Sequence, residues 1–268
     1  MSRIVRYFSF VVCAGQLFLA IAFFLRLPFA VNLWPFPGTT PLTIILVSSF
    51  LAAAAASTFW ATASENYGAL AGIGLDYLAV LIPLSIISFQ LGAKLGNPSV
   101  NVFGVACVLA AVFGLGLFVW GVRVPIDGAI PMPAPVRWSF VIFILALLAE
   151  STRLLLKVPN AIPWKITPDL SLVIGWMFLG AATYFAYGLL RPSWLNAAGQ
   201  LAGFLAYDVV LIVPFLTRFP TVAPQNLVGL IVYTVVVVYS GLLASYYLFV
   251  RESTRLWAKA PTSLPASD

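Results

Sequence analysis

Long apolar stretches, separated by short polar or proline-rich connections, dominate the pattern along the chain. Eight stretches recur, at roughly 5–25, 42–63, 69–90, 101–122, 137–156, 170–190, 195–217 and 226–250. A helix that rises 1.5 Å per residue needs about 20 residues to cross a hydrocarbon core of about 30 Å. The pattern therefore predicts an all-α integral membrane protein with about eight transmembrane helices.

Proline clusters mark the connections and divide the chain. They lie between the first two stretches, after Asn97, and between the fourth and fifth stretches. The connections are mostly shorter than about fifteen residues, which leaves no room for a water-soluble catalytic domain. We expect a first four-helix unit at 1–124, a proline-rich connection at 125–135, a second four-helix unit at 136–251 and a disordered tail at 252–268.

The two halves share residues at an offset of 131 positions. The matching segments are 5–7 with 136–138, 26–28 with 157–159, and 70–72 with 201–203. Charged residues and prolines are scarce in this chain, so these matches indicate an internal repeat. A unit with four crossings returns the chain to its starting side, so the sequence predicts two tandem repeats in parallel orientation about an axis along the membrane normal.

Small residues in the repeats predict where helices approach closely. Candidates are the alanines at 52–56, Gly72 with Gly74, and Gly241 with Ser245. The hydrophobic effect does not drive helices together inside a membrane. Small side chains let two helix backbones pack closely, and this packing stabilises their association. We expect a seam between the halves at such positions.

Composition supports a membrane location and limits the partners. Of 268 residues, 62% are hydrophobic and 8% are charged, whereas soluble domains carry roughly 25% charged residues. The net charge of +6 comes from Lys and Arg near helix ends, a pattern that favours the lipid bilayer as partner over nucleic acid. These residues are slightly more frequent on the side of the two termini, so we expect a multi-pass cell membrane protein with both termini in the cytoplasm.

Several kinds of chemistry are disfavoured by what the sequence lacks. The chain has no histidine, which removes histidine-bound haem or zinc and a histidine general base. Its two cysteines, Cys13 and Cys107, fall inside apolar stretches. We expect no cofactor and no metal site, and an intramembrane lipid-modifying enzyme is only the third alternative, because no clustered carboxylates are evident.

Two aspartates inside the apolar stretches are the main candidates for a binding site. Asp76 and Tyr77 lie in the third stretch, and Tyr207 and Asp208 lie in the seventh, in mirrored order. An ionisable group deep in lipid is costly unless it faces a partner or a water-filled cavity. One hypothesis makes the aspartates a pair at the repeat interface that binds a cation or carries a proton. The alternative is that each only fixes helix contacts through a tyrosine or backbone group.

Glu150 and Arg153 form a second candidate, because residues three apart share one face of a helix. A buried ion pair of this kind would favour contact with a substrate or partner. The alternative is an interfacial pair whose arginine extends toward water. Other polar residues have a helix-contact interpretation as well as a ligand-binding one. They are Gln16, Gln90, Gln200, Tyr233, Tyr239, Tyr246 and Tyr247.

The leading functional hypothesis is a carrier or channel for a small solute, ion or lipid, with a polar site at the repeat interface. The alternative is a non-catalytic accessory or structural subunit of a larger respiratory or photosynthetic type of membrane complex. Partners would then be other membrane subunits or a pseudo-symmetric homo-oligomer. Sparse polar content and short connections fit both hypotheses.

Overall fold

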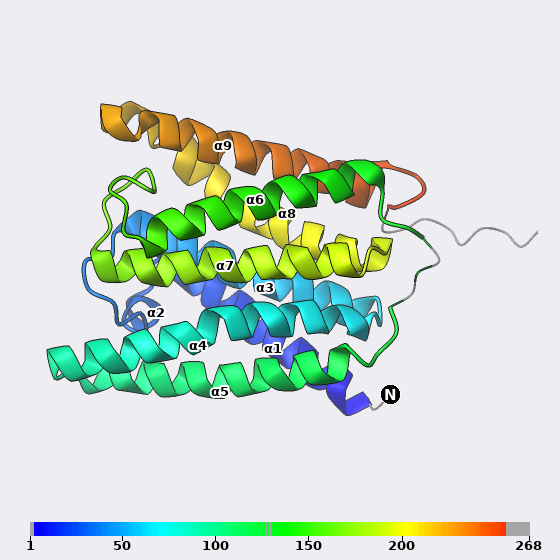
Figure 1. Cartoon of the computed structure of the whole chain (residues 1–268), viewed down its shortest axis with the longest axis horizontal. Helices are drawn as coiled ribbons and strands as arrows, with labels where there is room; N and C mark the ends of the chain where they lie inside the picture. Colours follow the sequence, from blue (N-terminus) through cyan, green and yellow to red (C-terminus); the bar gives the residue numbers. More distant parts are fainter. Residues whose placement is uncertain (1–2, 127, 129, 256–268) are drawn as a thin grey trace, which may run out of the picture.

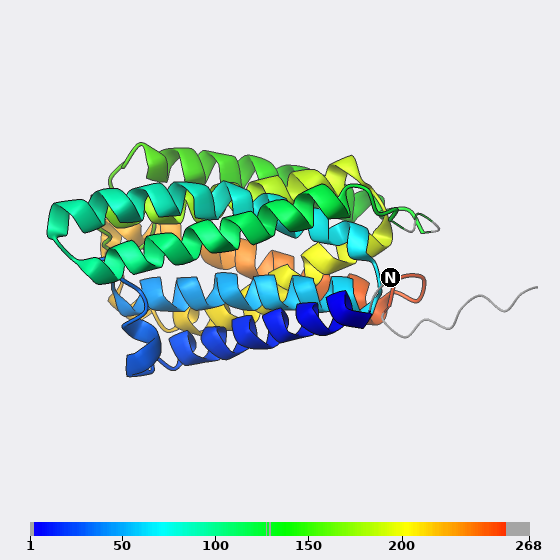
Figure 2. The same cartoon turned by 90° about the horizontal axis from the view of Figure 1, so that it is seen from below.

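The protein is an all-α bundle whose long helices run side by side (Figures 1 and 2). The computed structural model describes residues 3–126, 128 and 130–255. Within this part of the chain, eight helices are long and apolar enough to cross a membrane, which confirms the predicted fold class and helix number. These helices are α1 (Arg3–Phe24), α3 (Pro41–Ala63), α4 (Leu70–Leu95), α5 (Pro98–Gly121), α6 (Ala134–Leu155), α7 (Pro168–Leu190), α8 (Trp194–Leu216) and α9 (Pro224–Ser245).

Short elements complete the bundle. They are α2 (Pro28–Val31), the 3₁₀ turns η1 (Tyr67–Ala69) and η2 (Phe219–Thr221), and a π-helical turn η3 (Tyr246–Val250) that extends α9. The sequence did not predict α2, and α4 continues beyond the predicted end at residue 90 to Leu95. At that end Gly96 adopts a left-handed conformation with φ of 62°, which terminates a helix without a Cβ clash.

Capping residues and prolines explain where several long helices begin. The side chains of Thr40, Asn97 and Thr167 each accept a backbone N–H from the first turn that follows them. A proline occupies the first turn of each of these helices, where its missing N–H leaves no hydrogen bond unmade. The proline-rich connections therefore start helices as well as separate them.

Large apolar side chains are exposed on the outer faces of the long helices. On α5, Val102 and Leu109 are 68% and 67% exposed, and on α9, Val228 is 71% exposed. Such exposed apolar surface is stable against lipid tails and unstable against water. The bundle is therefore built to have hydrocarbon around it.

Helix contacts follow the same scheme in both halves. In the first half α1 packs on α3 and α4 packs on α5, and in the second half α6 packs on α7 and α8 packs on α9. The halves meet where α3 packs on α8 and α4 packs on α7. Exchanging the halves leaves this scheme unchanged, as a parallel repeat requires.

One pair of glycines follows the repeat offset closely. Gly72 of α4 lies against Tyr184 of α7, while Gly203 of α8 lies against Ala53 of α3. Gly72 and Gly203 are 131 residues apart, and so are Ala53 and Tyr184. The contacts across the seam therefore agree with the predicted repeat, although superposition of the complete halves stays a prediction.

Both ends of the described chain lie at the same end of the bundle (Figure 1), here called the N-terminal end. Residues 252–255, which we expected to belong to a disordered tail, form a turn instead. Thr254 is buried there and donates its hydroxyl to the backbone oxygen of Tyr247 at 2.8 Å. The remainder of the expected tail, 256–268, lies outside the described residues, as do residues 127 and 129 of the proline-rich connection.

Candidate functional site

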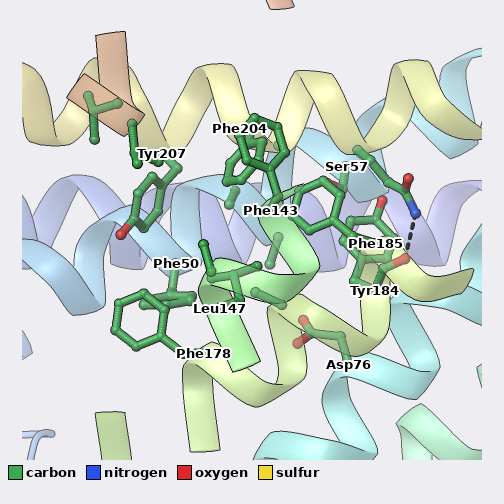
Figure 3. Close-up of a pocket in the computed structure, with 18 of the residues that line it drawn as sticks. Phe50, Ser57, Asp76, Phe143, Leu147, Phe178, Tyr184, Phe185, Phe204 and Tyr207 are labelled. Atoms are coloured by element: carbon green, nitrogen blue, oxygen red, sulfur yellow. Dashed lines mark hydrogen bonds between the residues drawn. The ribbon is translucent and has the colours of Figure 1, made fainter. Parts of the chain in front are cut away.

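A cavity of about 180 Å³ lies inside the bundle, at the seam between the halves (Figure 3). Its lining comes from α3, α4, α6, α7, α8 and α9. No described residue of α1 or α5 contributes to it. The cavity is therefore enclosed by the contacts of α3 with α8 and of α4 with α7, and by two further helices of the second half.

Eight of the 22 residues that line the cavity are aromatic. The rings belong to Phe50, Phe143, Phe178, Tyr184, Phe185, Phe204, Tyr207 and Tyr233. Several pack on one another, with centroids 4.7 Å apart for Phe143 and Phe204 and 4.5 Å apart for Phe185 and Phe204. Such mutual contacts hold the rings in place. The cavity is therefore a largely apolar, pre-formed space of the kind that binds small molecules.

Asp76 is one of two acidic residues that line the cavity. It extends from α4 into the cavity, and its carboxyl points toward the rings (Figure 3). Gly180 of α7 gives it room, because a Cβ at that position would meet Asp76 Oδ1. In the described part of the chain Asp76 has no ion pair and no hydrogen bond from another side chain. The carboxyl is therefore available to a ligand.

Glu150 lines the same cavity from the last turns of α6. Its Oε2 accepts a hydrogen bond from Arg153 Nη1 at 2.8 Å, and the side chain of Arg153 is 46% exposed while that of Glu150 is 15% exposed. Glu150 Oε1 and the Tyr233 hydroxyl are close enough to interact, but at this geometry neither atom completes a hydrogen bond with a described residue. Glu150 therefore connects an outward-facing arginine with the cavity interior.

Gln200 supplies a further polar group near the N-terminal end of the cavity. Its Nε2 donates to the backbone oxygen of Tyr184 at 2.6 Å (Figure 3, dashed line). Its Oε1 is buried and has no partner among the described residues. The amide nitrogen of Gln200 thus makes a helix contact. The amide oxygen remains able to accept a hydrogen bond.

Asp208 and Tyr77 are the other two residues of the Asp76-Tyr77 and Tyr207-Asp208 pairs. Neither of them lines the cavity. Tyr77 accepts a hydrogen bond from Gln16 Nε2 of α1 and lies against Gly114 of α5. Asp208 lies against α9, where Ser240 and Gly241 are its neighbours. The hypothesis that the two aspartates share one site is therefore not what the structure shows, and Asp76 shares its cavity with Glu150 instead.

The repeat offset explains this division. Asp76 corresponds to Tyr207, and both line the cavity, whereas Tyr77 corresponds to Asp208, and both face the fourth helix of their own half. Successive residues on an α-helix point about 100° apart. A shift of one position therefore turns the second carboxyl from the cavity to a helix contact.

The Asp208 carboxyl has one hydrogen-bonding neighbour in the described chain, the hydroxyl of Ser240. Ser240 Oγ lies 2.7 Å from the backbone oxygen of Val236 and 3.0 Å from Asp208 Oδ1. A hydroxyl has one hydrogen to donate, so Ser240 can donate fully to only one of these two acceptors at a time. Asp208 Oδ2 is buried without a partner in the described chain, a position that is costly for an ionised oxygen.

Asparagine at position 208 is therefore expected to be tolerated. In Asp208→Asn the amide oxygen can accept the Ser240 hydroxyl in place of Oδ1, so the free energy of unfolding should change by less than about 1 kcal/mol. Asp208→Ala removes the partner and leaves a small void, with an expected loss of about 1–3 kcal/mol. Thermal unfolding in mild detergent measures both. Equal losses for the two variants would show that an ionised Asp208 is required.

Sequence reasoning found the acidic cavity residues but missed their surroundings. Asp76, Glu150 and Tyr207 stood out because polar residues are rare in the stretches. Tyr184 and Gly180 carried no such signal, although the repeat offset from the alanine run at 52–56 leads to Tyr184. The phenylalanines of the wall are too common in this chain, which contains 21, to be singled out.

Comparison with protein-family models, with curated proteins and with solved structures gives no match. Function is therefore inferred from the cavity and its contacts.

Proposed function

We propose that this protein is a carrier for a small hydrophobic cation, which binds in the central cavity with Asp76 as its counter-ion. The observation that carries the proposal is a carboxyl without an ion-pair partner, set in an aromatic-walled cavity between the two halves. A carboxyl at this depth is costly, and a bound cation or proton would remove that cost.

The wall chemistry favours an organic cation over an inorganic one. Aromatic faces attract a cation that has lost its water, by about 2 kcal/mol or more when the site is desolvated. Hydrated metal ions need several oxygen ligands, and the described residues contain no group of three acidic, cysteine or histidine side chains that could hold one. An alkyl or aryl ammonium group satisfies the carboxyl and the rings together.

The helix scheme offers a way to move the ligand. The cavity lies where α3 meets α8 and α4 meets α7, which are the contacts between the halves. Rocking of one half against the other about these contacts would open the cavity to alternate sides, as in other carriers built from repeats. Asp76 would hold a proton when the ligand is absent, which couples flux to the proton gradient.

A pair of ligands with nearly the same shape tests the charge requirement. Benzyltrimethylammonium carries a positively charged quaternary nitrogen, and neopentylbenzene has a neutral quaternary carbon at the same place. We expect the cation to raise the thermal unfolding midpoint of the purified protein in a concentration-dependent manner, because it binds only the folded state. The neutral hydrocarbon should give a clearly smaller shift.

Equal shifts for the two compounds, or no shift for either, would contradict the proposal. Proton-coupled efflux of the cation from vesicles containing the protein would extend the result from binding to transport. Purification solely as a stoichiometric complex with other membrane proteins would favour the accessory-subunit alternative instead.

A further inference from the structure

The exposed residues of the cavity lining lie on two helices. Of the described residues that line the cavity, three are exposed: Ala146 on α6, and Val232 and Val236 on α9. The two valines have exposed fractions of 54% and 37%. All other lining residues are buried or partly buried. The mouth of the cavity therefore lies between α6 and α9.

The seam between α6 and α9 is closed by side-chain contacts at one end. Toward the N-terminal end, Ser139 of α6 and Tyr239 of α9 share a hydrogen bond of 2.7 Å, and the ring of Tyr239 lies 6.0 Å from that of Phe143. From there the ribbons of α6 and α9 diverge toward the opposite end (Figure 1). Glu150 lines the cavity near that opposite end, and the small side chain of Ala146 leaves space between the two limits.

The corresponding seam in the first half does not lead to the cavity. No described residue of α1 or α5 lines the cavity, and Phe8 of α1 packs edge-on against Phe113 of α5 with centroids 5.6 Å apart. The opening is therefore one-sided, although the helix scheme is the same in both halves.

We infer that the ligand reaches the cavity sideways from the hydrocarbon of the bilayer, through the seam between α6 and α9. This inference rests on the proposed function and narrows its substrate class to amphiphilic cations dissolved in the membrane. The rim residues on α6 and α9 belong to helices of transmembrane length, so their exposed faces contact lipid tails.

Two carboxyl groups lie along the path. Glu150, with Oε1 free of a hydrogen bond to any described residue, borders the cavity where α6 approaches its end, and its other oxygen is held by Arg153. Asp76 lies further along the lining on α4. A cationic head group positioned near the membrane interface would meet Glu150 first and Asp76 second, while its apolar part enters between Ala146 and the valines.

Substituting tryptophan for Ala146 at the mouth tests the path, and the same substitution at Ala149 is the control. Ala146 and Ala149 are both exposed on α6, but only Ala146 lines the cavity. In lipid nanodiscs, Ala146→Trp should slow the binding of benzyldimethyldodecylammonium at least about tenfold, because the indole fills the gap, whereas Ala149→Trp should stay within about twofold of the parent. Similar rates for both variants would overturn the lateral path.

Spin labels provide a second measurement that needs no bulky side chain. A nitroxide on Ala146→Cys, with Cys13 and Cys107 replaced by serine, should be relaxed strongly by oxygen in the lipid and weakly by a water-soluble nickel chelate. Strong relaxation by nickel would place the mouth in water and refute the inference.

The proposed function and the lateral path can be refuted separately. Absence of any binding that depends on Asp76 would refute the proposed function. Binding that depends on Asp76, together with unchanged access in Ala146→Trp, would refute only the lateral path.

Discussion

Replacing Asp76 with asparagine is expected to abolish charge-selective binding while leaving the bundle folded. The carboxyl lines the cavity and has no ion-pair partner in the described chain, so its removal leaves no unpaired group behind. A hydrogen bond or contact to a charged group contributes about 1.5–3 kcal/mol. The affinity for benzyltrimethylammonium should therefore fall about 10- to 100-fold, with little change for neopentylbenzene.

Asp208→Asn is the matched control for this experiment. It also removes one carboxyl from the interior of the bundle, but Asp208 contacts Ser240 and does not line the cavity. The control should bind both compounds as the parent does. Titration calorimetry in detergent and proton-coupled flux in vesicles measure the two variants in parallel. Comparable loss in both would mean that the effect comes from bundle stability, and unchanged binding in Asp76→Asn would remove the role assigned to this carboxyl.

The second large effect is expected where α4 and α5 touch, at Gly74. A Cβ on Gly74 would lie 2.5 Å from the backbone oxygen of Gly114 and 2.6 Å from the backbone nitrogen of Phe118. Backbone atoms cannot move aside as a flexible side chain can, so valine must push the helices apart. Overpacking of this kind costs about 1–3 kcal/mol, and we expect Gly74→Val to fall near the upper value.

Gly116 supplies the control on α5. A Cβ there would meet nothing within 4 Å, so Gly116→Val should change the free energy of unfolding by less than about 1 kcal/mol. Thermal unfolding of the two variants in the same detergent measures the difference. Equal stability would show that α4 and α5 are not in close backbone contact in the membrane.

The fold was largely predictable because the bilayer imposes one length on every crossing. Prolines and capping residues at Thr40, Asn97 and Thr167 then set where helices start. The extension of α4 to Leu95 was not predicted, because Gln90 and Lys94 lower the hydropathy of its end although backbone hydrogen bonds continue. Polarity marks where lipid ends and is a poor guide to where a helix ends.

The site was predictable in its members but not in its grouping. Rarity of charge singled out Asp76 and Asp208 alike, yet rarity carries no information about the direction in which a side chain points. The repeat register did contain that information, because it pairs Asp76 with Tyr207 and not with Asp208. Glu150 joins the cavity through the tertiary arrangement of α6, which no local pattern in the sequence specifies.

If the ligand enters between α6 and α9 as proposed, the two halves of the chain have different tasks. Residues on the outer faces of α1 and α5 serve the lipid contact alone, so their drift during evolution should leave ligand choice untouched. Substitutions on α6 and α9 change the exposed part of the cavity lining, which is the rim of the proposed path. Substitutions that change ligand choice should therefore accumulate in the second half of the chain, and the packing surface of the first half should change less.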